Sequence, residues 1–196
     1  MGELTKGTLP PMIRVLIFTS GEASGAEKAR LEGLKDSLEK AQYFILKVLE
    51  DKGDRGVGSA HAAEALRKHP EVGGYFGVMP YHAGVLLGAV RAEKRERMVS
   101  VIVYGNTPEG RDGLATGGVY AVVRPDLSDL SNKLSAALLA LSTGKTPPEL
   151  PENRCYSAGL LVEKTEKPRN LEEIADALQI PRVLEETTVV PRPSFE

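Results

Sequence analysis

Short apolar runs alternate with amphipathic stretches along most of the chain. Five runs predict β-strands, at residues 13–20, 43–50, 72–79, 99–105 and 119–124. The stretches that follow strands carry apolar residues at helical spacing, and they predict helices that begin near residue 26 and that cover residues 60–69, 82–97 and 127–141. Residues 107–118 (TPEGRDGLATGG) are rich in turn formers and predict an irregular connection.

This alternation predicts an α/β fold. Parallel neighbouring strands need crossover connections, so a repeated strand–helix order indicates a doubly wound, mostly parallel five-stranded sheet with helices on both faces. The simplest arrangement is flavodoxin-like, with Rossmann-like winding and strand order 2-1-3-4-5. Residues 157–164 (SAGLLVEK) predict one more short strand at an edge of the sheet.

The helix after the fifth strand has the clearest amphipathic pattern in the chain. Leucines at 127, 130, 134, 138 and 141 form one stripe, and Gly144 ends the helix. We expect a single α/β domain over residues 1–165 and a C-terminal extension over residues 166–196. The extension is predicted to hold one short acidic helix, which begins near Asn170 and ends at Pro181, and then an extended tail.

Composition and charge narrow the classes of partner. The chain has 196 residues, 41% of them hydrophobic, so it can build a core, and its net charge of −2 favours neither nucleic acid nor an acidic membrane. The apolar run near the N-terminus is short and follows two prolines, which predicts a buried strand rather than a secretory signal, and we expect a cytoplasmic protein. Cys155, His61, His69 and His82 lack metal-ligand spacing, so no metal site is expected, and the cofactor is unknown.

From about Ile13 to Glu163 a series of motifs resembles one known family. The segments ARLEGLKDSL, LRKHPEVGGYFGVM, AGVLLGAVRA, VIVYGNTPEG and GGVYAVVRPD follow one another in the order and spacing of that family, and the segment TGKTPP comes after the last helix. They resemble the C-terminal half of ribose-type periplasmic sugar-binding proteins and the effector domains of LacI-type repressors. The resemblance implies a ligand site between two lobes. The first lobe is missing here, so segments after the fourth strand should fold back onto the same sheet or complete a partner subunit.

Several ligand-gripping positions of that family differ in this chain. Where the resembling proteins carry an Asn-Asp pair after the third strand, this chain has Met79 and Pro80, and the Asp after the fourth strand is replaced by Gly105. The basic position on the first helix persists as Arg30. Because a sugar site needs paired hydrogen-bonding groups, these differences predict a polar or anionic ligand other than an ordinary sugar.

The loop between the first strand and the first helix is the first candidate site. Backbone N–H groups and the helix dipole favour anions at such a helix start, and Ser20, Gly21, Ser24 and Gly25 line it. Arg30 lies within two helical turns and can grip a carboxylate or phosphate. The alternatives are an empty turn and a surface arginine paired with Glu27 or another acid.

Three residues at the ends of later strands complete the predicted ligand site. Tyr81 and His82 follow the third strand and Asn106 follows the fourth, and ligands favour the carboxyl ends of parallel strands. For His82 the alternative is a helix-start residue exposed to water.

Three functions are compatible with these residues. The first is a non-catalytic domain that binds or senses a small polar or anionic molecule. The second is an assembly module without a ligand, which joins two chains or a partner chain through a sheet edge and the C-terminal tail. The third is an enzyme of flavodoxin-like fold, acting on a phosphorylated substrate or a flavin at the opening loop. The sequence favours no catalysis, because no catalytic triad, acid–base pair or metal set is recognisable.

Overall fold

The computed structural model describes residues 13–21, 24–147 and 160–166. The elements along the chain are β1 (Arg14–Thr19), α1 (Gly25–Lys40), β2 (Phe44–Glu50), α2 (Arg55–Lys68), β3 (Val72–Gly77), α3 (His82–Ala92), β4 (Ser100–Tyr104), α4 (Pro108–Thr116), β5 (Ala121–Pro125), α5 (Leu127–Ser142) and β6 (Leu160–Lys164). The five predicted strands and four predicted helices are therefore confirmed. Helix α2 begins earlier than predicted, because the side chain of Asp54 accepts hydrogen bonds from the backbone of Gly56 and Val57.

The strands form one sheet in the order β2-β1-β3-β4-β5-β6. Strands β1 to β5 are parallel in the predicted order 2-1-3-4-5, and β6 pairs antiparallel with β5 at the edge. The sheet thus has six strands rather than five, and the sixth is the edge strand that the sequence predicted.

Helix α4 corrects the prediction of an irregular connection. Thr107 caps the helix by accepting from the backbone N–H of Gly110, Pro108 lies in its first turn, and Gly117 ends it with a left-handed φ of 81°. These are ordinary helix start and stop signals. The glycines inside the segment obscured them, although Gly113 is needed there because a Cβ at this position would lie 2.4 Å from a methyl group of Val119.

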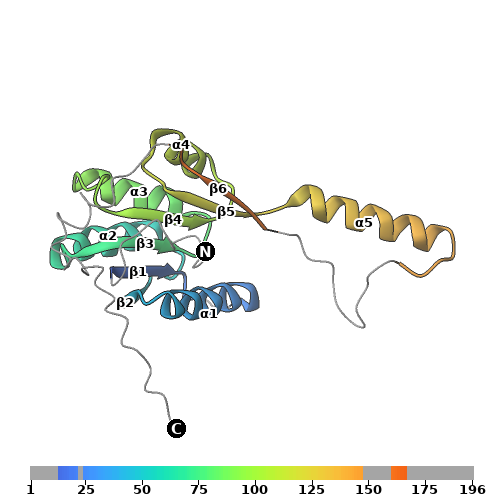
Figure 1. Ribbon diagram of the computed structural model, residues 1–196, viewed down its shortest axis with the longest axis horizontal. Helices are drawn as coiled ribbons and strands as arrows, with labels where there is room; N and C mark the ends of the chain where they lie inside the picture. The colour runs from blue at the N-terminus through green and yellow to red at the C-terminus, as the bar shows by residue number, and fades with distance from the viewer. Residues whose placement is uncertain (1–12, 22–23, 148–159, 167–196) are drawn as a thin grey trace, which may run out of the picture.

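Helices cover both faces of the sheet, as Figure 1 shows. Alternate residues of β1 enter two cores. Val15 and Ile17 pack with Leu34 and Leu38 of α1, whereas Phe18 packs into the core formed with α2 and α3. The continuous apolar run of β1 is therefore explained by burial on both faces.

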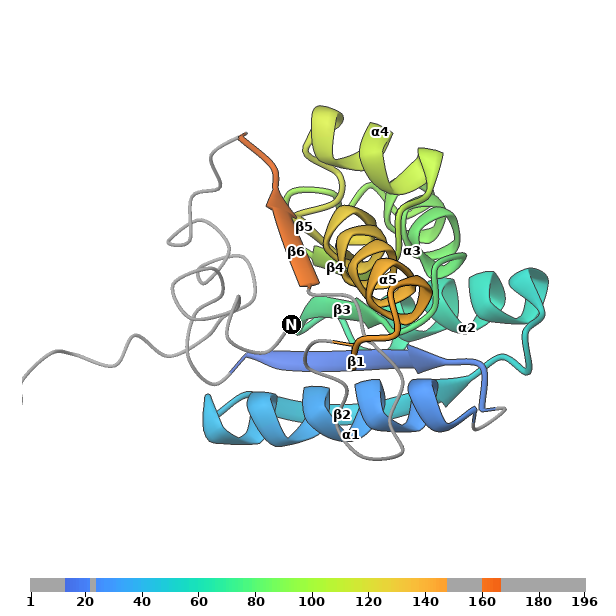
Figure 2. The same ribbon diagram turned by 90° about the vertical axis from the view of Figure 1, so that its right-hand side faces the viewer.

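Helix α5 is the exception to this packing. Figure 1 shows that it extends away from the sheet, and Figure 2 views it nearly end-on. Ala137 is its one buried residue. Strands β5 and β6 fold back onto the same sheet as expected, but the helix between them does not. Four leucines of its stripe, Leu127, Leu134, Leu138 and Leu141, are accordingly exposed, and Leu130 is half-buried.

The remaining predictions lie outside the described residues. They concern Cys155, the acidic helix near 170–181 and the extended tail, and the division of the chain at residue 165 also stays a prediction. Within the described ranges, no helix combines the length and the apolar character needed to cross a bilayer.

Candidate ligand site at the carboxyl ends of the strands

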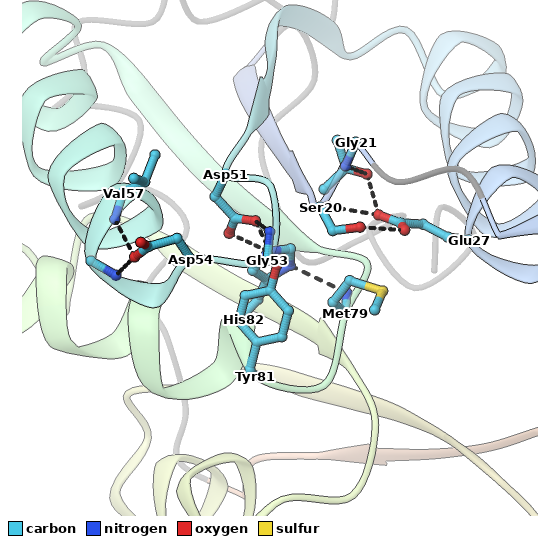
Figure 3. A network of polar contacts seen from close by, with 12 residues as sticks. Ser20, Gly21, Glu27, Asp51, Gly53, Asp54, Val57, Met79, Tyr81 and His82 are labelled. Atoms are coloured by element: carbon cyan, nitrogen blue, oxygen red, sulfur yellow. Dashed lines mark hydrogen bonds and ion pairs between the residues drawn. The ribbon is translucent and has the colours of Figure 1, made fainter.

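The opening loop holds a carboxylate from its own helix. Glu27, in the first turn of α1, is 2% exposed and accepts hydrogen bonds from Ser20 N at 2.7 Å and Ser20 Oγ at 2.6 Å (Figure 3). It also accepts from Thr19 Oγ1. Ser24 caps the helix by accepting from Glu27 N at 3.3 Å. Ser24 and Glu27 thus have the Ser-x-x-Glu spacing of a capping box, a signal that was present in the sequence.

Glu27 is ionised in this setting. Burial alone raises the pKa of Glu27, but the hydrogen bonds from Ser20 and Thr19 and the nearby charge of Arg30 outweigh it, and the pKa lies below its ordinary value. The backbone N–H and the hydroxyl of Ser20 are therefore already bonded to an anion, the Glu27 carboxylate. A phosphate or flavin placed at this loop, as the enzymatic alternative requires, meets the negative charge of Glu27.

Arg30 links the ends of β3 and β4. Its Nε donates to Val78 O at 3.1 Å, its Nη2 lies 3.5 Å from Met79 Sδ, and its guanidinium carbon lies 4.3 Å from the centre of the Tyr104 ring. The alternative of a surface arginine paired with Glu27 is wrong, because Glu27 bonds to Ser20 and Thr19 while Arg30 is half-buried against the two strand ends. The cation–π contact and the bond to Val78 hold the guanidinium in one place.

A buried polar network joins the ends of β2 and β3. The carboxylate of Asp51 accepts from Gly53 N at 3.0 Å and from the Tyr81 hydroxyl at 2.5 Å through one oxygen, and its other oxygen lies 3.0 Å from His82 Nε2. Figure 3 shows the Asp51 carboxylate beside the side chains of Tyr81 and His82. Asp51 is 1% exposed and His82 is fully buried. The alternative of a water-exposed His82 is therefore wrong.

The hydrogen bonds define the tautomer of His82. Met79 N donates to His82 Nδ1 at 3.2 Å, so the ring proton lies on Nε2, which donates to Asp51. Burial lowers the pKa of His82, and the charge of Asp51 offsets this only in part, so the pKa remains below 6.5 and the ring is neutral. Both ring nitrogens are occupied by the protein, and His82 supports the loop that carries Met79, Pro80 and Tyr81.

Two glycines make room for this network. A Cβ on Gly77 would lie 2.4 Å from the Cβ of His82, and a Cβ on Gly58 would lie 2.8 Å from Asp51 Oδ2. Such contacts are closer than van der Waals packing allows. Gly77 lies on β3 and Gly58 on α2, so two elements leave room for the buried pair of His82 and Asp51.

The other predicted site residues are more loosely placed. Asn106 is exposed, and its side-chain oxygen accepts from Arg111 at 3.3 Å. Gly21 and Gly25 are exposed at the two ends of the opening loop. The structure thus brings Ser20, Arg30, Tyr81 and His82 into bonded clusters at one edge, and ligand contact by any predicted residue stays a prediction.

Sequence reasoning missed three residues that organise this edge. They are Glu27, Asp51 and Tyr104. Asp51 and Tyr104 stand at the ends of apolar runs, where parallel strands present their side chains to one edge, and that position was the available signal. Within the described residues no group of three or more His, Cys, Asp or Glu side chains could hold a metal ion.

The sheet order, the helices on both faces and the cluster at the carboxyl ends define a known class of fold. It is the fold of sugar-binding proteins of ABC transporters, of which the chain has about half, and the resemblance in the sequence is confirmed at the level of fold. Scans against protein-family models and against curated proteins find no match.

Three solved structures illustrate the likeness. GanP, a glucose-galactose binding protein from Geobacillus stearothermophilus, is 20% identical with a TM-score of 0.69, over 84% of this chain and 57% of its own. AraP, an arabinose binding protein from the same organism, is 19% identical with a TM-score of 0.69, over 88% of this chain and 59% of its own. A solute binding protein from Agrobacterium vitis with bound D-fucose is 13% identical with a TM-score of 0.70, over 83% and 55%. The chain therefore spans little more than half the length of these proteins.

Proposed function

We propose that this chain is a non-catalytic domain that binds or senses a small polar molecule at the carboxyl ends of β1, β3 and β4. The observation that carries the proposal is the position of Arg30, which is held between Val78 and Tyr104 at this edge. A fixed guanidinium loses little conformational freedom when it donates to a ligand oxygen.

The chemistry of the site favours a ligand with hydroxyl or carboxylate oxygens near Arg30. One of the five guanidinium donors is bonded to a protein oxygen in the described part of the chain, which leaves donors for a ligand. The negative charge of Glu27 repels an anionic group from the opening loop, whereas the positive charge of Arg30 attracts one. The structural neighbours support a small polar ligand, because they include a glucose-galactose binding protein, an arabinose binding protein and a solute binding protein with bound D-fucose.

A thermal-shift screen tests this function. Purified protein, Arg30→Ala and Arg67→Ala are each heated with panels of sugars, sugar phosphates, nucleotides and small carboxylates. Binding to the folded state increases the free energy of unfolding by about 2.7 kcal/mol when the ligand is present at a hundredfold excess over Kd. The melting temperature rises as a result. Arg67 is a matched control, because it is a surface arginine of α2 paired with Glu93 at 2.7 Å.

The expected result is a compound that stabilises the wild type and Arg67→Ala but not Arg30→Ala. The shift is taken within each variant, so any loss of stability in Arg30→Ala cancels. A screen in which no compound stabilises the wild type, together with native mass spectrometry that finds no retained small molecule, overturns the proposal.

A further inference from the structure

Arg30 and His82 are bonded to opposite ends of the same peptide group. This group joins Val78 to Met79 in the loop after β3. Its carbonyl oxygen accepts from Arg30 Nε at 3.1 Å. Its N–H donates to His82 Nδ1 at 3.2 Å (Figure 3). Because a trans peptide group is planar and holds its C=O and N–H in opposite directions, a rotation of this group moves both bonds together.

The polar contacts continue beyond both residues. On the far side of His82, Nε2 lies 3.0 Å from Asp51 Oδ2. On the far side of Arg30, the guanidinium carbon lies 4.3 Å from the centre of the Tyr104 ring. One chain of contacts thus runs from the end of β2, through the loop after β3, to the end of β4. In such a chain each hydrogen bond polarises the next, so a change at one end is felt at the other.

The neighbours of the His82 ring hold it in one orientation. The ring is fully buried, and its centre lies 6.3 Å from that of Phe18 and 4.5 Å from that of Tyr81. At the density of a protein interior, these contacts leave little room for the ring to turn away from Met79. A change in the hydrogen bonding of Nδ1 therefore acts on the peptide group rather than on the ring.

A proton on Nδ1 reverses the bond to Met79. In the neutral ring Nδ1 is the acceptor, whereas both nitrogens of an imidazolium are donors. The Met79 N–H then faces another N–H at 3.2 Å, while Nε2 still donates to Asp51. The peptide group is driven away from the ring, and its carbonyl oxygen leaves Arg30 as it turns.

The charges around His82 decide when this proton is taken up. The titratable and charged groups that face the ring or its bonded neighbours come from α1, α2, α4 and the loops after β2 and β3, namely Glu27, Arg55, Glu109, Asp51 and Tyr81. The carboxylates of Asp51 and Glu27 favour the proton, but burial outweighs them, and the pKa of His82 lies below 6.5.

The other neighbours of the ring add little net charge. Arg55, 6.0 Å from the centre of the Tyr81 ring, is paired with Glu109 at 3.8 Å, so its charge is partly offset. The residues that β1 and β3 pack against His82 are Phe18 and Gly77, which are uncharged. The proton is therefore taken up below pH 6.5.

We propose that Asp51 and His82 are positioning residues for Arg30, and that a proton on His82 releases the guanidinium from Val78. This role rests on the proposed function, in which Arg30 contacts the ligand, and it predicts weaker ligand binding in acid. The coupling of His82 to Arg30 is a property of the protein without a ligand, so it is tested without one.

NMR spectroscopy of the ¹⁵N-labelled full chain, from pH 7.5 down to the onset of unfolding, is the test. The ring ¹⁵N signals of His82 report its tautomer and protonation, and the Arg30 Nε–H and Met79 N–H signals report the two bonds. We expect one midpoint for all three residues. We also expect the protection of the Met79 N–H from hydrogen exchange to fall by about tenfold, as for one lost hydrogen bond.

Two results of this titration overturn the proposal. The first is an Arg30 signal that stays fixed, or that moves with another midpoint, while His82 titrates. The second is a His82 ring that stays neutral until the protein unfolds.

Substitutions of the buried pair separate this coupling from a general loss of structure. Asp51→Asn removes a charge that favours the proton, so the midpoints of His82 and Arg30 should fall together, and midpoints that separate contradict the coupling. His82→Asn does not titrate, and its side-chain oxygen can still accept from the Met79 N–H, so the Arg30 signal should no longer shift with pH. An Arg30 shift that persists in His82→Asn overturns the proposal. His69→Gln, at a histidine whose side chain is 40% exposed, is the matched control and should leave the Arg30 titration unchanged. Circular dichroism establishes that each variant is folded.

The proposed function and this coupling fail separately. A thermal-shift screen without a hit overturns the proposed function and leaves the NMR titration to decide the coupling. Where the screen returns a neutral sugar, that sugar should stabilise the wild type less below the His82 midpoint than at pH 7.5, and should stabilise His82→Asn equally at both. Equal stabilisation of the wild type at both pH values overturns the predicted effect on binding.

Discussion

The buried histidine should make the stability of this protein depend on pH near neutrality. His82 is neutral in the folded state because burial lowers its pKa below 6.5. In the unfolded chain the ring is solvated and takes up a proton near pH 6.5. Above that pH the His82 ring is neutral in both the folded and the unfolded state, so it contributes no pH dependence to the stability. As the pH falls below 6.5 the unfolded state alone binds the proton, so the folded state loses stability until the lowered folded pKa is reached.

The size of this effect follows from linkage. One proton taken up by the unfolded state alone changes the free energy of unfolding by about 1.4 kcal/mol per pH unit. Between pH 7.5 and 5.5 the loss from His82 is therefore at most about 1.4 kcal/mol, because full slope is reached only below pH 6.5 and ends at the folded pKa. A loss of that size lowers the melting temperature of a chain of this length by about 3–6 °C.

Urea unfolding, followed by circular dichroism at pH 7.5, 6.5 and 5.5, measures this loss of unfolding free energy. Three proteins are compared, namely the wild type, His82→Gln and His69→Gln. The glutamine amide at position 82 does not titrate, so this variant is expected to be less stable at pH 7.5 but to lose less stability on acidification. His69 is 3.5 Å from Glu71 at the surface and serves as the control. Equal pH slopes for the wild type and His82→Gln refute a neutral, buried His82.

Further predictions concern the same edge of the sheet. Gly77→Ala should lower the free energy of unfolding by about 3 kcal/mol or more, because the new Cβ would lie 2.4 Å from the Cβ of His82. Urea unfolding should show no such loss for the control Gly33→Ala. At position 33 a Cβ meets nothing within 4 Å, and helix propensity favours alanine. Glu27→Gln should lose about 1–3 kcal/mol near pH 7, because an amide cannot accept all the bonds from Ser20 and Thr19. Because folding lowers the pKa of Glu27, the ionised carboxylate stabilises the folded state above pH 4.5, and this stabilisation is lost as the pH falls through the folded pKa. The stability of Glu27→Gln should therefore fall less steeply than that of the wild type between pH 5 and 3. Tyr81→Phe removes the hydroxyl bonded to Asp51 and should cost about 1–2 kcal/mol in the same urea assay, and an unchanged midpoint would contradict that bond.

The order of elements was predictable because hydrophobic periodicity is local. The run IRVLIF is apolar at every position except Arg14, because β1 is covered on both faces. The stripe Leu31, Leu34, Leu38 marks the apolar side of α1. The strand order followed from crossover rules that apply to parallel sheets in general. Helix α4 was missed because its glycines resemble a turn, although Thr107 and Pro108 carried the start signal.

The meeting of the selected residues at one edge was predictable, but their bonding was not. Residues at the ends of strands come together because parallel strands end at the same edge, and on this basis Ser20, Tyr81 and His82 were selected, whereas Arg30 was selected for its place on the first helix near the opening loop. The partners of these residues were not accessible to such reasoning. Asp51 lies 31 positions from His82, and no local pattern links them.

The sequence by itself determined which segments form strands and helices, and which side of each helix is apolar. Both properties depend on neighbours within a few positions along the chain. The tertiary structure alone decided that Arg30 lies against Val78 and Tyr104, that His82 is buried beside Asp51, and that Leu134 and Leu138 of α5 stay exposed. Each of these depends on which surfaces meet in space. That choice is made by packing between segments distant in the sequence, where a buried charge requires a partner and an apolar stripe requires a cover.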